Sequence, residues 1–241
     1  MLIALTLAVL AIFLGGDSPF IVPKLDNYVK THVVDDGRKT IVLEFLDDAK
    51  AKRKLKIKEG KKQLKHLDDL FNSRETTQLE MNTAVQNIID LQAQSQRANI
   101  LVNQEAQKNI TLEEWNAIIA DMGKDLEKAN KKISKMNVKI NKAYTNWEEK
   151  INKNIVAVDK RNKAIEAAQE LKAVYLKNRK FIQQELMNKN SIIYQYNTPE
   201  KELNDLQIKF IQLLEEVLTG AAETHFKLID LTTEEEWKKI L

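Results

Sequence analysis

The 241-residue sequence contains no cysteine and little glycine, proline or aromatic side chain. Without cysteine, the chain has no disulfide, no thiol nucleophile and no cysteine-ligated metal site. It has only six glycines and three prolines, and none of the residues between Pro23 and Pro199 is a proline. Sheet-rich and loop-rich folds need both residue types in their turns. This scarcity predicts an all-α protein built from long helices.

Recognisable signatures of catalysis and metal binding are also missing. The three histidines, His32, His66 and His225, are far apart in the sequence, and none has a neighbour at metal-ligand spacing. No phosphate-binding, dinucleotide-binding, zinc-protease or nucleophile-elbow motif occurs. Carboxylates are abundant, but on lysine-rich helices they form i,i+4 ion pairs more often than acid–base dyads. We therefore expect no enzyme, no catalytic residue, no cofactor, no metal and no small-molecule substrate.

The first sixteen residues contain no charged side chain. The apolar run 2–14 gives a helix of roughly 20 Å, which is shorter than the ~30 Å hydrocarbon core of a bilayer. Extension through Phe20, Ile21 and Val22 supplies the missing length. We predict a single transmembrane anchor over residues 1–23. Its apolar side chains are Leu2, Ile3, Leu5, Leu7, Val9, Leu10, Ile12, Phe13 and Leu14.

Two other interpretations of this segment are a secretory signal peptide and a buried core helix. No Lys or Arg precedes the apolar run and no small-x-small cleavage site follows it, which disfavours the signal peptide. Basic residues first occur after the run, at Lys24, Lys30, Arg38 and Lys39. The positive-inside rule then favours the cytoplasmic side for the long remainder of this single-pass membrane protein.

Residues 24–48 form a predicted juxtamembrane connector with two alternatives. A short helix would begin at Pro23 and end at Gly37, with Leu25, Val29 and Val33 on one face. A β-hairpin would instead turn at Asp36-Gly37. We favour the helix, because an isolated hairpin is marginally stable without something to pack on.

A basic stretch follows, with nine cationic side chains and one acid, Glu59, between residues 50 and 65. We interpret it as a candidate contact for anionic lipid headgroups or an acidic partner. The alternative is an ordinary solvated helix surface, because five of the lysines recur at helical spacing. The candidate contact residues are Lys50, Lys52, Arg53, Lys54, Lys56, Lys58, Lys61, Lys62 and Lys65. Basic and acidic side chains nearly balance, at a net charge of +3, so the composition does not indicate binding of nucleic acid.

Residues 49–196 carry alternating three- and four-residue spacings of apolar side chains, the pattern of a coiled coil. We predict a long antiparallel coiled-coil hairpin that reverses near residues 108–112, where Thr111 and Glu114 match a capping box. Its second arm is expected to be one helix over 112–193, with a stutter between Trp147 and Val158. The seam residues are Leu64, Leu67, Phe71, Met81, Val85, Ile88, Trp115, Ile119, Met122, Leu126, Ile133, Met136, Ile140 and Trp147.

Residues 197–241 form the predicted C-terminal helical segment, which packs alongside the hairpin. Thr198-Pro199-Glu200 indicates the start of one helix. Thr233 and Glu236 indicate the start of a last short helix.

The sequence favours a non-enzymatic, membrane-anchored coiled-coil subunit that scaffolds or extends a larger membrane complex. Its expected partners are other subunits of that complex or further copies of the chain, together with membrane lipid. The first alternative is an α-helical pore-forming or membrane-lytic protein, which must keep its apolar run hidden until it is triggered. The second alternative is a holdase chaperone whose helical tentacles grip unfolded clients.

Overall fold

The computed structural model describes Phe20 and residues 22–240, and over these residues the fold is all-α, without a strand. Five long helices account for most of this part of the chain. The helices are α2 (Leu25–His32), α3 (Asp36–Asn72), α4 (Gln78–Gln107), α5 (Leu112–Asn154), α6 (Val158–Phe181), α7 (Glu200–Leu231) and α8 (Glu234–Ile240). A π-helical turn, η1 (Ile182–Leu186), extends α6, and a 3-10 turn, η2 (Ile192–Tyr194), precedes α7.

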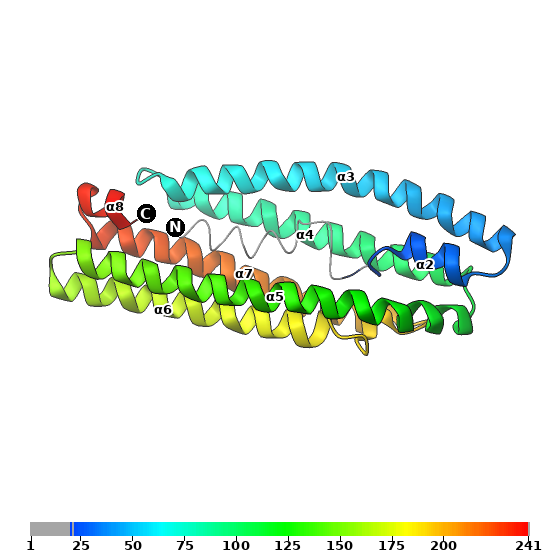
Figure 1. Cartoon of the computed structure of the whole chain (residues 1–241). Coiled ribbons are helices and arrows are strands. Elements are labelled where there is room, and N and C mark those ends of the chain that lie inside the picture. The colour runs from blue at the N-terminus through cyan, green and yellow to red at the C-terminus, as the bar shows by residue number, and fades with distance from the viewer. Residues whose placement is uncertain (1–19, 21, 241) are drawn as a thin grey trace.

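The long helices form an elongated antiparallel bundle (Figure 1). Neighbours pack in the order α3, α4, α7, α6, α5, while α2 bridges α3 and α5 at one end and α8 packs on α5 at the other. We call the first the Arg38 end; it also contains the α4–α5 turn. The second, the His225 end, contains the α3–α4 and α5–α6 turns. At 43 residues, α5 is about 65 Å long and nearly spans the bundle.

Side-chain caps define where most of these helices begin. Asp35 accepts a hydrogen bond from the Arg38 amide at the start of α3. Reciprocal capping boxes, in which a threonine and a glutamate satisfy each other's backbone amides, start three further helices. The pairs are Thr77 with Glu80, Thr111 with Glu114, and Thr233 with Glu236. The capping boxes predicted at Thr111 and Thr233 are confirmed.

The chain turns more often than the predicted hairpin of residues 49–196. A turn at 108–111 separates α4 from α5, where the reversal was predicted. Two further turns, at 73–77 and 155–157, break each expected arm into shorter helices that pack side by side. The continuous helix over 112–193 is therefore wrong: α5 ends at Asn154, and Ile155 is an extended C-cap rather than part of a stutter.

The apolar seams meet each other within the chain. Twelve of the fourteen named seam residues are buried, and the remaining two, Ile119 and Met136, are half-buried against the same core. The largest buried side chains include Trp115 and Trp147 on α5. The pairing that the heptad pattern demands is thus supplied by this chain's own helices.

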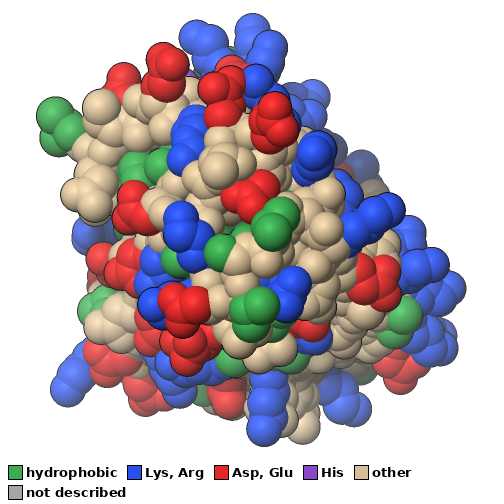
Figure 2. Space-filling model, turned by 90° about the vertical axis from the view of Figure 1, so that its left-hand side faces the viewer, with side chains coloured by type: hydrophobic (Ala, Val, Ile, Leu, Met, Phe, Trp, Pro, Cys, Tyr) green, Lys and Arg blue, Asp and Glu red, His purple; other side chains and the backbone are tan. Residues whose placement is uncertain are grey.

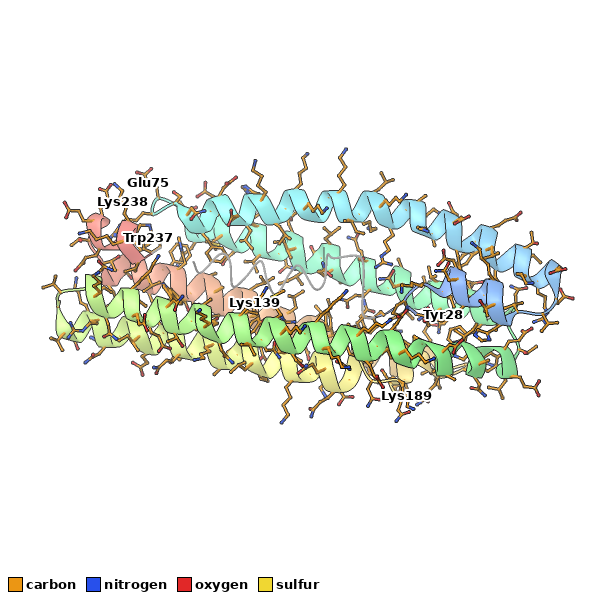
Figure 3. The ribbon with its side chains drawn as sticks, viewed as in Figure 1. Tyr28, Glu75, Lys139, Lys189, Trp237 and Lys238 are labelled. Carbon is orange, nitrogen blue, oxygen red and sulfur yellow. The ribbon has the colours of Figure 1, made fainter. Side chains whose placement is uncertain are left out.

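The connector over residues 24–48 contains the helix α2 and the beginning of α3, so the β-hairpin alternative is wrong. Gly37 lies in the first turn of α3 rather than ending a helix. Lys24 and Tyr28 both reach Asp125 on α5, at 2.9 and 3.0 Å. These bonds fasten α2 to the bundle (Figure 3). Burial, with help from Asp125, raises the pKa of Tyr28 to about 12.

Glu114 joins three segments at the Arg38 end. Arg38 binds both of its carboxylate oxygens, at 2.7 and 2.9 Å, and donates a further bond to the Asn109 carbonyl. The amides of Val34 and Thr111 also donate to Glu114. Arg38 above all lowers the pKa of Glu114 to about 2. The turns before α3 and α5 are therefore held together by one buried carboxylate.

We expect Glu114→Ala to destabilise the bundle by about 1–3 kcal/mol, because buried donors lose a charged acceptor. The stabilisation that ionised Glu114 provides is complete above its ordinary pKa of 4.5 and is lost as the pH falls toward 2. Urea unfolding at pH 7 and pH 3 measures both effects. Glu113→Ala, at an exposed acid in the same turn, is the matched control. Equal stability of the two variants at pH 7 would contradict this role.

Candidate functional site

The chain enters the bundle core directly after the uncharged N-terminal run. Phe20 is fully buried, and Val22 is 1% exposed. The Phe20 ring packs edge-on against Phe210 of α7, with 5.5 Å between ring centroids. Phe20 and Val22 were predicted to complete the membrane anchor. They belong instead to the core between α4 and α7.

Asn103 of α4 holds this entry segment by its backbone. Its Oδ1 accepts a hydrogen bond from the Val22 amide, and its Nδ2 donates to the Phe20 carbonyl, each at 3.3 Å. Gln107, one turn further along α4, holds the loop before α7 in the same way, through Asn197 N and Gln195 O. Two side-chain amides on one helix thus fix two segments that lie outside the long helices.

Asn103 and Gln107 belong to a buried polar stripe on α4, with members spaced by three or four residues. Each member is at most 5% exposed. The stripe consists of Gln92, Gln96, Asn99, Asn103 and Gln107. The observed partners of Asn103 and Gln107 are segments of the same chain, which heptad spacing alone does not reveal.

The predicted anchor residues Leu2, Ile3, Leu5, Leu7, Val9, Leu10, Ile12, Phe13 and Leu14 lie outside the described residues. Within the described part of the chain, none of the helices combines the length and the apolarity needed to cross a bilayer.

The basic stretch 50–65 lies along α3. Seven of its nine cations are exposed, and Arg53 and Lys56 are half-buried. Three contact neighbouring side chains: Lys50 pairs with Asp26, Lys52 with Asp48, and Lys56 donates to Gln94. Five of the exposed lysines form an outward strip about 17 Å long: Lys54, Lys58, Lys61, Lys62 and Lys65. Leu55, 71% exposed, lies among them.

This basic strip of α3, with Leu55, has the composition of a peripheral membrane contact. An apolar side chain reaches the acyl boundary while lysines meet anionic headgroups. Viewed from the His225 end, Lys and Arg side chains gather along the top of the molecule, where α3 runs (Figure 2). Exposed hydrophobic side chains at that end occur in small patches between charges.

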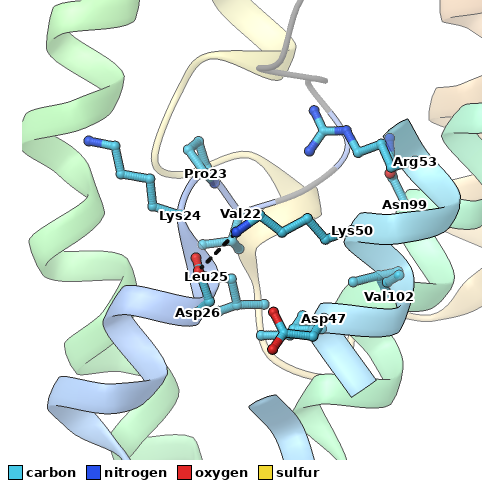
Figure 4. Close-up of a pocket in the computed structure, with 12 residues that line it drawn as sticks. Val22, Pro23, Lys24, Leu25, Asp26, Asp47, Lys50, Arg53, Asn99 and Val102 are labelled. Atoms are coloured by element: carbon cyan, nitrogen blue, oxygen red, sulfur yellow. Dashed lines mark ion pairs between the residues drawn. The ribbon is translucent and has the colours of Figure 1, made fainter. Parts of the chain in front are cut away.

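A cavity of about 240 Å³ lies between the entry segment, α2, α3 and α4 (Figure 4). Its lining includes Val22, Leu25, Val102 and the ion pair of Lys50 with Asp26, at 3.6 Å. No His lines it, and Lys50 and Asp26, which pair with each other, both belong to the lining. Among the described residues, no three His, Asp or Glu side chains are grouped to hold a metal.

The core also contains a buried cation. Arg179 of α6 is 1% exposed; its Nε donates to the Tyr175 hydroxyl, and its guanidinium lies 5.3 Å from the Tyr175 ring centroid. Both terminal nitrogens lack a hydrogen-bond partner in the described structure, and burial lowers the pKa of Arg179. A buried charge with unsatisfied donors destabilises the compact state. Tyr175 and Arg179 follow the heptad spacing of the second arm, but spacing alone does not reveal that this guanidinium is buried.

Comparison with models of known protein families, with curated proteins and with solved structures finds no match to this chain. The fold itself defines the class: an all-α antiparallel bundle with a buried N-terminal entry segment and a basic outer strip.

We expect Asn103→Leu to loosen the entry segment, since it leaves the Phe20 carbonyl and the Val22 amide buried without partners, at a cost of about 1–3 kcal/mol. Trypsin cleavage after Lys24, whose side chain is 62% exposed, should accelerate. Gln104→Leu, at the half-buried neighbouring position, is the control. Cleavage at the wild-type rate in Asn103→Leu would show that Asn103 does not hold this segment.

We expect the basic strip to bind anionic vesicles. Replacing Lys54, Lys58 and Lys62 by Gln should weaken co-sedimentation with phosphatidylserine vesicles by roughly 10- to 100-fold, given about 1 kcal/mol per lysine near the surface. The matched control replaces Lys131, Lys132 and Lys135 of α5, which are also exposed. Equal losses in the two triple variants would indicate net charge rather than a specific surface.

Proposed function

We propose that this protein is an α-helical membrane-lytic or pore-forming protein, and that the closed bundle is its state before insertion. The observation that carries this proposal is the burial of Phe20 and Val22 in the core, immediately after an uncharged run of membrane-compatible composition. A protein that attacks membranes must hold such a run back until it meets a bilayer. The hydrogen bonds from Asn103 to Phe20 and Val22 tie the residues just after this run to the closed bundle.

The self-pairing of the seams supports the same proposal. The scaffold interpretation rested on the predicted anchor and on helices longer than a self-contained fold requires. In the bundle the named seam residues pack on each other, so the fold accounts for them without a partner. Buried Arg179 adds a second argument, because an unsatisfied buried cation favours rearrangement to a state in which it is hydrated or paired.

The second candidate is a single-pass, membrane-anchored scaffold subunit, which the basic strip of α3 favours. Cations along the outer face suit a bundle that lies beside an anionic membrane or an acidic subunit. In this alternative the apolar run 1–16 stays in the bilayer, and the partners are other subunits of the complex. The holdase hypothesis requires open apolar seams, whereas the named seam residues are buried or half-buried, so we do not propose it.

Leakage of a dye from liposomes, caused by the detergent-free full-length chain, tests the leading proposal. We expect Leu7→Glu/Leu10→Glu to abolish leakage, because each charge in a membrane-inserted run costs about 2.5–3.5 kcal/mol. The control is Val138→Glu/Leu176→Glu, at exposed positions of α5 and α6. Circular dichroism of both variants monitors the bundle.

The two candidates predict different outcomes. Leakage by the wild type and the control, but not by the Leu7/Leu10 variant, supports the lytic protein. No leakage, together with alkali-resistant retention in native membranes and defined co-purifying subunits, supports the scaffold. Leakage that persists in the Leu7/Leu10 variant contradicts a role for the apolar run.

A further inference from the structure

The His225 end contains a buried histidine with apolar surroundings. His225 on α7 is fully buried, and its ring nitrogens have no carboxylate partner among the described residues; a backbone interaction with Phe71 offsets only part of the effect of burial. Three aromatic rings surround it edge-on: Phe71 of α3 at 5.6 Å, Phe226 at 5.0 Å and Trp237 of α8 at 5.2 Å between centroids. An imidazolium in this place would be a buried charge with no anion to pair with.

This cluster joins the end of α3 to two consecutive helices, α7 and α8, that come much later in the sequence. Phe71 is in the last turn of α3, His225 is near the end of α7, and Trp237 is 3% exposed on α8 at the tip of the bundle (Figure 3). Beside it, Arg74 of the α3–α4 turn donates to the Ile229 and Thr232 carbonyls at the end of α7. The aromatic contacts and the Arg74 bonds together close this end.

Apart from Asp68, whose Oδ1 is buried without a hydrogen-bond partner among the described residues, the charged groups named on the surrounding elements are paired elsewhere or exposed. Glu236 on α8 accepts bonds from the Thr233 and Val156 amides, and Glu234 pairs with Lys238. On α7, Lys227 pairs with Glu170 of α6, and Glu223 is exposed. On α3, Asp69 is exposed and Asp68 is half-buried, with its pKa raised chiefly by burial. None of these carboxylates forms an ion pair with His225 in the described structure.

The opposite end responds to acid differently. Its closure depends on ionised Glu114, whose pKa is about 2, and on Arg38, so it persists until the pH falls well below 4.5. At the His225 end, burial lowers the pKa of His225 from 6.5 to about 4. The neutral imidazole therefore stabilises this end fully above pH 6.5, and that stability is lost as the pH falls from 6.5 toward 4.

We propose that the bundle is an acid-sensitive device that opens from the His225 end, by release of α8 and the end of α7, while the Arg38 end stays closed. This inference goes beyond the proposed function and does not depend on it, because the opening is a property of the chain in buffer. Between pH 6 and 5 the two ends have different stabilities. Mild acid thus frees one tip of the bundle without unfolding the whole.

Hydrogen–deuterium exchange of the full-length chain at pH 7 and pH 5, corrected for intrinsic exchange rates, tests this proposal. An imidazole that regains its ordinary pKa on opening raises the opening constant by about 30-fold at pH 5. We expect that increase in residues 66–76 and 222–240. Residues 34–40 and 108–116, at the Arg38 end, should remain protected.

Three variants assign the effect to His225. His225→Phe, which fills the aromatic cluster with an uncharged ring, should keep the His225 end protected at pH 5. His66→Gln removes an exposed histidine and Asp68→Asn removes the half-buried acid; both should retain the 30-fold response. If His225→Phe fails to fold, the pKa of the His225 ring, measured by NMR in the wild type, tests whether this histidine causes the response. A ring that titrates near 6.5, a response lost in Asp68→Asn, or an equal response at both ends would overturn the proposal.

Discussion

The mutual burial of the helices' apolar seams is the interaction on which the rest of the structure depends. No single long helix here buries its own seam, and each gains stability only when its neighbours cover it. The chain meets this requirement by folding back at three tight turns and through the longer connection 182–199, which together bring α3, α4, α7, α6 and α5 into contact. Once the bundle is closed, its two ends become places where side chains from distant segments meet. The entry segment, the Glu114 junction and the His225 cluster all follow from that closure.

The core is not optimised for stability alone. Asn103 and Gln107 are buried amides with good partners, whereas Gln96 on the same stripe and Arg179 on α6 have buried atoms without any among the described residues. Buried polar groups without partners lower the stability of the compact state. Under the proposed action at a membrane, this cost brings the compact state closer in free energy to the inserted state.

Several features were accessible from the sequence because they depend on local rules. The scarcity of Gly and Pro predicted an all-α fold, and the Thr111 and Thr233 capping boxes predicted two helix starts. The Thr77–Glu80 box was equally visible and marks the turn at 73–77, but the heptad tracing ran through it. The turn after Asn154 had no such signal. Its residues, Ile155, Val156 and Ala157, include neither Gly nor Pro, and the Val156 amide is satisfied by Glu236 of α8, 80 residues away.

The sequence by itself determined the helical class, the amphipathic seams and the clustering of cations on one segment, because these depend on residue type and spacing within one helix. Only the tertiary structure decided which seams pair, and it replaced a single hairpin with a bundle because pairing depends on turns stabilised by remote side chains. It also decided that Phe20 and Val22 lie in the core, although their apolarity suits a bilayer equally well. Burial of His225 was likewise invisible in the sequence, since it depends on Phe71 of α3 and Trp237 of α8 as well as on the neighbouring Phe226.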